Sequence, residues 1–275
     1  MLKEKSQIEV SKIGLCALGH WTPETALQIH QNLEIHSWAP WLAASPESLV
    51  GRAKTFSEGH LFLKSPTGEI IASVSSNRIN WDGQVKHLPN WDTVAGDPTT
   101  YEKTYVHDGN TLTLMSMNVH PAYKKYGLAT ALVHQIQEVA TSLGVEYIAG
   151  SFRPSEFGSY KAMHGAIAFD EYAFKQREDG LPVDAWIRSL TRNGMIPLIV
   201  DKKAMTVPVD MATFEDLKIN YHPDSWYQIS ENVWECGEVG QWQLDLKEGK
   251  ATYQESNVWG ILPGTPGYNK FIKSI

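Results

Sequence analysis

The stretch from Asn118 to Gly144, NVHPAYKKYGLATALVHQIQEVATSLG, constrains the fold more than any other part of the sequence. It overlaps the end of TLTLMSMNV, which alternates as a strand does, and His120-Pro121 ends that strand. After Gly127, apolar residues recur every three or four positions, as one face of a helix requires: Leu128, Leu132, Ile136, Val139 and Leu143. Gly144 stops the helix, and VEYIAG, residues 145–150, indicates a buried strand. This order predicts a right-handed crossover between two parallel strands.

The turn that opens this helix has the composition of an anion-binding site. Gly127 and the small Ala129 allow a ligand to approach the backbone, where helix N–H groups attract a phosphate. Thr130 can add a hydroxyl, and Lys124 and Lys125 add positive charge. The Gly-Lys-Ser/Thr order of nucleotide-binding loops is absent, as is the repeated glycine of dinucleotide-binding folds. An ordinary strand-to-helix turn is the alternative interpretation.

The run MSMNVHPAYKKYGLATALV resembles the central motif of the GNAT superfamily of acyl-CoA-dependent acyltransferases. In that family a strand ending in Val-x-Pro is followed by Arg/Gln-x-x-Gly-x-Gly/Ala. Val119-His120-Pro121 matches the strand end and residues 124–129 match the loop, with Lys124 replacing the usual Arg or Gln. The resemblance implies an α/β fold: a mixed, mostly antiparallel sheet with helices on both faces and a central strand-turn-helix-strand motif. It also implies a single domain over residues 1–275, with a core over roughly residues 8–200 that residues 201–275 complete or decorate.

The resemblance further implies where coenzyme A binds. Backbone amides of residues 125–130 would hold its pyrophosphate, and the strand edge at residues 117–119 would pair with its pantetheine arm. Backbone donors at that edge can stabilise an oxyanion in acyl transfer. The implied cosubstrate is acetyl-CoA or another acyl-CoA such as malonyl-CoA, and we expect no metal. The implied binding residues are Met117, Asn118, Val119, Lys124, Lys125, Tyr126, Gly127, Leu128, Ala129 and Thr130.

The general acid of the superfamily has no counterpart at its usual position. Most members carry a tyrosine four residues before the Gly-Phe that opens the next strand. Asn193-Gly194-Met195 stands at that turn here, and Leu190 lies four residues before Gly194. We therefore expect the acid or base within SFRPSEFGSYKAMHG, residues 151–165, where His164 is the candidate because an imidazole titrates near neutrality. A packing or surface histidine is the open alternative.

Other candidates surround this segment. Arg153 can bind a substrate carboxylate through two parallel hydrogen bonds, or cap carbonyl groups at the surface. Glu156 and Glu171 are alternative bases. The insert is also similar to a GNAT-like subgroup found in polyketide synthase loading modules and in nitrilase fusions. That resemblance implies that His164 and Thr130 flank the thioester carbonyl, while Trp38 or Trp41 closes the cleft.

Composition excludes several other functions. The net charge is −7 and no basic run occurs, which argues against nucleic-acid binding. Cys16 and Cys236 lack metal-ligand spacing. No signal-like segment and no run of about 20 apolar residues is present, so we expect a cytoplasmic protein without a membrane partner.

Three functions follow as hypotheses. The first is transfer of an acyl group, most simply acetyl, from acyl-CoA to an amine of a small-molecule acceptor. The second is malonyl-CoA decarboxylation with S-acetyl transfer to the thiol of an acyl carrier protein. The third is a non-catalytic module that binds acyl-CoA.

The remaining chain gives coarser predictions. We expect one strand over residues 8–18, helices opening at Thr22 and Ser45, and a hairpin around the turn SPTG, residues 65–68. Residues 81–110 indicate a long functional loop. A helix over residues 183–192 precedes a strand at MIPLIV, and the last sixty or so residues indicate short strands and turns.

Overall fold

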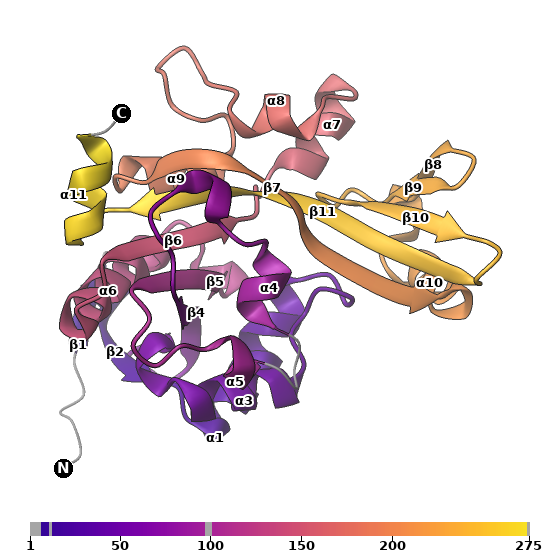
Figure 1. Ribbon diagram of the computed structural model, residues 1–275. Coiled ribbons are helices and arrows are strands. Elements are labelled where there is room, and N and C mark those ends of the chain that lie inside the picture. The colour runs from indigo at the N-terminus through magenta and orange to yellow at the C-terminus, as the bar shows by residue number, and fades with distance from the viewer. Residues whose placement is uncertain (1–6, 11–12, 97–100, 274–275) are drawn as a thin grey trace. The chain divides into compact units, whose positions relative to one another are not determined.

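The computed structural model describes residues 7–10, 13–96 and 101–273. The chain forms two compact units, which are described separately here (Figure 1). Unit 1 comprises Met1–Pro89, Thr93–Gly150 and Ile261–Ile275; unit 2 comprises Asn90–Asp92 and Ser151–Gly260. A single domain over residues 1–275 stays a prediction.

The strands of unit 1 are neighbours in chain order. They are β1 (Gln7–Val10), β2 (Gly14–His20), β3 (Leu61–Lys64), β4 (Ile70–Ile79), β5 (Thr111–Val119) and β6 (Tyr147–Phe152), the last as far as Gly150. Pairs from β1–β2 to β4–β5 are antiparallel, whereas β5 and β6 are parallel. The predicted mixed, mostly antiparallel sheet is therefore confirmed, and so is the parallel crossover.

One strand prediction in unit 1 is wrong. The range 8–18 contains two antiparallel strands, β1 and β2, rather than one, while residues 11–12 lie outside the described residues. Ile13 N donates to Val10 O at 3.0 Å, and Gly14 adopts a φ of 91°, a conformation that glycine takes at little cost. That turn reverses the chain inside the apolar run.

The helices of unit 1 begin where their capping residues predict. Thr22 caps α1 (Pro23–Ile29) and Ser45 caps α3 (Pro46–Thr55). Residues 81–110 are not a structureless loop, because they contain η3 (Val85–His87), α4 (Trp91–Ala95) and α5 (Tyr101–Thr104), while residues 97–100 lie outside the described residues. The other helical segments are η1 (His30–Glu34, a π-helix), α2 (Ile35–Ser37), η2 (Ser57–Gly59), η4 (Pro121–Tyr123), α6 (Leu128–Leu143) and α11 (Pro266–Ile272).

Two packing groups fix these helices on the sheet. The first joins α1, η1 and α3 to the strands through Trp21, Ala26, Ile29, Leu33, Leu49, Ala53, Phe62 and Ile70. The second is the buried stripe of α6, formed by Leu128, Leu132, Val133, Ile136 and Ala140. Val139 and Leu143, which the spacing placed in this stripe, are only half-buried. Because α6 packs on β4 and β5, its first turn is held close to the end of β5.

Unit 2 contains more regular structure than its sequence predicts. Its strands are β7 (Ile196–Asp210), β8 (Tyr227–Ser230), β9 (Val233–Glu235), β10 (Gln241–Asp245) and β11 (Lys250–Leu262), the last as far as Gly260. β8 to β11 pair antiparallel in chain order, and β7 also pairs with β11. Its helical segments are α7 (Phe157–His164), α8 (Phe169–Ala173), α9 (Ala185–Arg192), α10 (Met211–Asn220) and η5 (Pro223–Ser225).

The short strands predicted for the last sixty or so residues are present as β8, β9 and β10, of four, three and five residues. The prediction missed the 13-residue β11 and the helices α10 and α11. Aromatic packing explains α10. Phe214 is fully buried, and its ring lies 5.7, 6.4 and 5.4 Å from the rings of Trp226, Trp234 and Trp242. Many of the tryptophans near the C-terminus therefore belong to a core rather than to an open cleft.

Candidate functional site

The central strand β5 loses its parallel partner half-way along. It pairs with β6 over residues 111–114, opposite residues 147–150, but continues along β4 to Val119. The register on β4 shifts between Ser75, opposite Ser116, and Ser76, opposite Leu114, so Met115 is the extra residue of a β-bulge. Within the described part of unit 1, residues 117–119 thus pair with β4 only, and no other strand of that unit pairs with their second edge.

The turn after β5 is anchored to the start of β4. His120 N donates to Ile71 O at 2.9 Å, and His120 Nδ1 accepts from Ala122 N at 3.2 Å. The hydroxyl of Tyr123 donates to Glu69 Oε2 at 3.4 Å. These contacts hold residues 120–123 against the sheet and so fix the path into α6.

The first turn of α6 begins with backbone amides that no side chain caps. Gly127 precedes the helix with φ 82° and ψ 8°, and no side chain caps it. The amides of Leu128 and Ala129 precede the bond from Ala131 N to Gly127 O, so they lie outside the helical ladder. A Cβ built on Gly127 meets nothing within 4 Å, so the space beside the backbone is open.

Two lysines flank this turn. Lys124 and Lys125 are exposed, and Lys125 has a positive φ of 72°. Neither is in an ion pair among the residues that the structure describes. Their charge adds to the positive end of the helix dipole. The next residue in the chain, Tyr126, has a half-buried side chain.

The side chain of Asn118 faces the protein. It is buried, its Nδ2 donates to Glu34 Oε2 at 2.6 Å, and its Oδ1 accepts from Trp38 Nε1 at 2.8 Å. Its backbone N–H and C=O face β4, because His120, two residues further on, pairs with Ile71 through a hydrogen bond of 2.9 Å. The backbone groups that point away from β4 are those of the half-buried Met117 and Val119. The sequence analysis did not single out Glu34. The feature that could have indicated its role is an acidic residue directly after the apolar Leu33, on the buried side of the helical segment.

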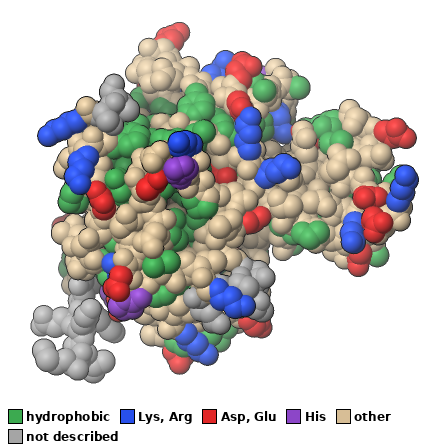
Figure 2. Space-filling view, in the orientation of Figure 1, with side chains coloured by type: hydrophobic (Ala, Val, Ile, Leu, Met, Phe, Trp, Pro, Cys, Tyr) green, Lys and Arg blue, Asp and Glu red, His purple; other side chains and the backbone are tan. Residues whose placement is uncertain are grey.

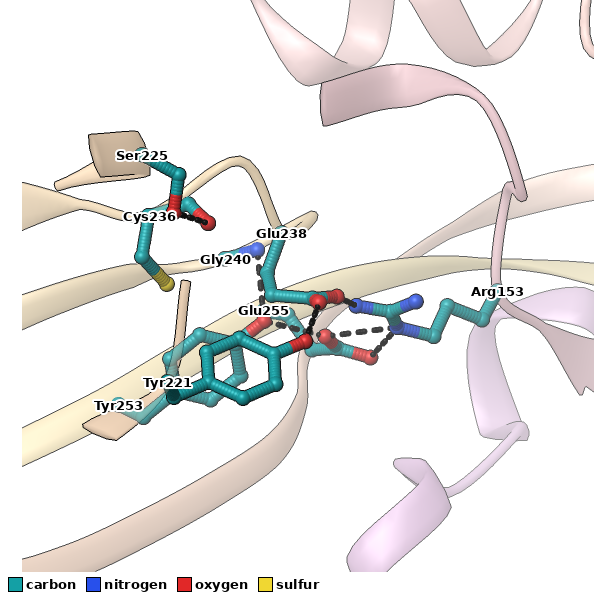
Figure 3. Close-up of polar contacts among 8 residues, drawn as sticks. All are labelled: Arg153, Tyr221, Ser225, Cys236, Glu238, Gly240, Tyr253 and Glu255. Carbon is teal, nitrogen blue, oxygen red and sulfur yellow. Dashed lines mark hydrogen bonds and ion pairs between the residues drawn. The ribbon is translucent and has the colours of Figure 1, made fainter. Parts of the chain in front are cut away.

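Arg153 lies in unit 2, where two carboxylates hold its guanidinium (Figure 3). Its Nε lies 3.0 Å from both carboxylate oxygens of Glu255, and Nη2 donates to Glu238 Oε2 at 2.6 Å. Tyr253 and Tyr221 donate to the same carboxylates at 2.7 and 2.5 Å. Burial acts to lower the pKa of Arg153, but the two carboxylates outweigh it and raise that pKa. A substrate carboxylate at Arg153 would compete with both.

The remaining catalytic candidates are separated between the units. His164 ends α7 in unit 2, where it is exposed and its ring centroid lies 4.4 Å from that of Tyr160. Thr130 is half-buried in the first turn of α6, in unit 1. The roles predicted for His164, Thr130 and Arg153 stay predictions.

The alternative bases and Leu190 have clear surroundings in unit 2. Glu156 Oε2 accepts from Ala185 N at 2.9 Å, which ties the start of α7 to the start of α9. Glu171 is exposed on α8. Leu190 is fully buried in α9, so the position predicted for the acid holds a core side chain.

The sequence analysis did not identify two carboxyl groups of unit 2, those of Asp92 and Asp201. Asp201 Oδ2 accepts from Ser151 Oγ at 2.5 Å and from Trp91 N at 3.0 Å, and Asp92 Oδ2 accepts from Thr206 N at 2.8 Å. Burial raises the pKa of each carboxyl to about 6. Short local patterns do not reveal this pair, because its partners are distant in sequence.

The described residues contain no group of three histidine, cysteine or acidic side chains able to hold a metal. Among the same residues, no helix has the length and apolar character of a membrane span. Cys16 and Cys236 are buried free thiols. Basic and acidic side chains are interspersed over the described face in Figure 2.

Comparisons with known proteins identify a family and a fold. Residues 27–161 match the model of the acetyltransferase (GNAT) family. The loading GNATL domain of CurA from Lyngbya majuscula is similar in structure, with a TM-score of 0.61 and 15% identity over 90% of this chain and 96% of that one. The GphF GNAT-like decarboxylase in complex with isobutyryl-CoA gives a TM-score of 0.57 and 19% identity over 68% of this chain and 90% of that one. No curated protein sequence matches the chain. Residues 27–161 are therefore similar to the acetyltransferase (GNAT) family, and the chain has the GNAT fold of these two structures.

Proposed function

We propose that the chain is an acyl-CoA-dependent acyltransferase that moves an acyl group, most simply acetyl, to an amine of a small-molecule acceptor. The observation that carries this proposal is the junction of two features in unit 1. The edge of β5 opens beyond Leu114, and the uncapped start of α6 follows eight residues after the strand. A coenzyme A molecule has a pyrophosphate for the second feature and an extended pantetheine amide chain for the first.

The chemistry would proceed at the thioester. The acceptor nitrogen attacks the carbonyl carbon, the tetrahedral oxyanion collapses, and the carbon–sulfur bond breaks to release coenzyme A. Backbone N–H groups along residues 117–119 would stabilise the oxyanion. The thiolate takes up one proton and the acceptor nitrogen loses one, which is the work we propose for His164.

A second candidate is malonyl-CoA decarboxylation followed by S-acetyl transfer to a carrier-protein thiol. Two observations favour it. Leu190 fills the position predicted for the usual phenolic acid with a buried apolar side chain. The two structures described above are a loading GNATL domain and a GNAT-like decarboxylase, by their own descriptions. Here the carbon–carbon bond of malonyl-CoA breaks to release CO₂, and the resulting carbanion takes a proton from solvent to give acetyl-CoA. The carrier-protein sulfur then attacks the thioester carbonyl, the carbon–sulfur bond to coenzyme A breaks, and the released thiolate takes up the proton that the carrier thiol loses.

Coenzyme A binding is tested by making the same substitution at each end of α6. Gly127 and Gly144 flank α6, both adopt left-handed φ angles of 82° and 64°, and neither has an atom within 4 Å of a built Cβ. We expect Gly127→Glu to abolish coenzyme A binding in calorimetry and Gly144→Glu to leave it intact. Equal binding by both variants would refute the anion site at the start of α6.

The reaction is tested by its products. The full chain is incubated with acetyl-CoA or malonyl-CoA, with a panel of amines or with a carrier protein, and the products are identified by mass spectrometry. Acetylated amine supports the first candidate, and CO₂ release with acetylated carrier protein supports the second. Coenzyme A binding without any product supports a non-catalytic binding module instead.

A further inference from the structure

Glu34 is a buried carboxyl that joins three separate parts of unit 1. Its side chain is almost fully buried at the end of η1. Oε1 accepts from Ala44 N at 2.9 Å and Oε2 accepts from Asn118 Nδ2 at 2.6 Å. Its main-chain oxygen accepts from Trp38 N at 3.2 Å. One residue therefore holds both ends of the segment from Trp38 to Ala44 and fastens that segment to β5.

These contacts fix the orientation of the Asn118 amide. A carboxylate can only accept a hydrogen bond and an indole N–H can only donate one. Nδ2 must therefore face Glu34 and Oδ1 must face Trp38, so rotation of the amide by 180° would break both bonds. Because each oxygen of Glu34 faces an N–H donor, protonation would place a donor against a donor.

The consequence concerns Trp38. Its indole is tied to a residue of β5 that lies between Met117 and Val119, on the segment where the parallel partner has been lost. A large aromatic ring fixed beside a binding edge limits the volume available to the group bound there. Glu34 lies in a π-helix, an irregularity that is frequent at functional sites.

We propose that Glu34 and Asn118 are positioning residues that hold the indole of Trp38 against β5 and so restrict the enzyme to small acyl groups. The inference rests on the proposed function, because it takes the edge of β5 as the place of the thioester. Glu34 acts through Asn118, and Asn118 acts through Trp38. The chemical class selected is a compact acyl-CoA thioester, with branched and longer acyl groups disfavoured.

The test compares binding of free coenzyme A, acetyl-CoA and isobutyryl-CoA by calorimetry, which needs no acceptor. We expect the wild-type chain to prefer acetyl-CoA over isobutyryl-CoA. Trp38→Phe keeps a ring but lacks the N–H group, and Asn118→Leu keeps the size but lacks the amide. In both variants we expect the preference to fall about tenfold.

The control lies in unit 2. Trp226→Phe makes the same substitution at a half-buried tryptophan whose indole N–H donates to Tyr221 O at 2.7 Å, so it should keep the wild-type preference. Glu34→Gln tests the first link, because an amide cannot accept from both Ala44 N and Asn118 Nδ2 through separate oxygens. Combined with Trp38→Phe, it should add nothing to the loss of preference, since both substitutions act on the hydrogen bond between Asn118 and Trp38. A purely structural role would lower the melting temperature without changing the preference.

The outcomes separate this inference from the proposed function. If the wild-type chain binds coenzyme A and prefers acetyl-CoA, yet Trp38→Phe and Asn118→Leu retain that preference, the positioning role is wrong and the function stands. A wild-type chain that binds coenzyme A without distinguishing the two thioesters also overturns the positioning role. A wild-type chain that binds no coenzyme A overturns both.

Discussion

Arg153 Nε lies 3.0 Å from each carboxylate oxygen of Glu255, a side chain with no exposed surface (Figure 3). The two residues are 102 positions apart in sequence. Arg153 is itself 20% exposed and also pairs with Glu238. The guanidinium that the sequence offers to a substrate is thus already the centre of a charged network, and the two roles make different predictions.

The structural role predicts a loss of stability. In Arg153→Met the buried carboxylate of Glu255 loses its counter-charge, so we expect the free energy of unfolding to fall by about 3 kcal/mol. Urea denaturation measures this change. Arg177→Met is the control, because Arg177 pairs with Asp179 at an exposed position and should cost less than about 1 kcal/mol. Unchanged stability with a raised KM would instead support a substrate-binding Arg153.

Local sequence signals predicted the central crossover because they agree with one another there. The alternating β5, the left-handed Gly127, the apolar stripe of α6 and the stop at Gly144 each act within a few residues. The β1–β2 hairpin and α10 were missed because tertiary contacts decide them. Phe214 of α10 packs against tryptophans that lie further along the chain.

The candidate site also contains local features that the sequence predicts and long-range contacts that it does not. The turn at residues 120–127 is a local motif, and one sequence was enough to find it. The hydrogen bond between Glu34 and Asn118 spans 84 positions, and no periodicity or spacing indicates which distant amide a buried carboxyl will meet. The sequence does not indicate the carboxyls of Asp92 and Asp201 for the same reason, since burial in the folded chain is what raises their pKa values.

Asp201 predicts a dependence of stability on pH. Burial raises the pKa of its carboxyl from 3.8 to about 6, so the native state binds the proton more tightly than the unfolded chain. Stability therefore rises as pH falls from about 6 towards 4, and this contribution is lost as pH rises through about 6. In Asp201→Asn we expect the melting-temperature gain between pH 7 and pH 5 to shrink by about 2 °C. Asp224→Asn, exposed in the same unit, should follow the wild-type profile; a change equal to that of Asp201→Asn would contradict the prediction.

Hydrogen bonds of the buried His60 and Tyr101 side chains should contribute to the free energy of unfolding of unit 1. Ser76 N donates to His60 Nδ1 at 3.3 Å, so the proton of the neutral ring lies on Nε2 and donates to the Tyr101 hydroxyl at 3.1 Å. That hydroxyl donates to Ser76 O at 2.9 Å. Burial holds the pKa of His60 well below its usual range, so the ring stays neutral. Tyr101→Phe should cost about 2 kcal/mol in denaturant unfolding, because it orphans a buried donor and a buried acceptor. Tyr105→Phe, at a half-buried ring against Phe56, is the matched control; an equal loss there would argue against the hydrogen-bond explanation.

His164 makes the most direct prediction about chemistry. It is an exposed histidine whose ring lies against Tyr160, so its removal should disturb little of the core. If it carries the proton, His164→Asn lowers kcat by a factor of about 100 to 10,000 and leaves the affinity for coenzyme A unchanged.

Unit 2 offers a matched control in His222, which is also exposed and whose ring lies 4.4 Å from the ring of Tyr221. Asparagine suits that position, because His222 has a positive φ of 43° that asparagine tolerates. We expect His222→Asn to keep the wild-type kcat, measured by release of free coenzyme A thiol with the acceptor that the product analysis identifies. Wild-type turnover in His164→Asn would remove this histidine from the mechanism and return the proton transfer to Glu171 or to the acceptor itself.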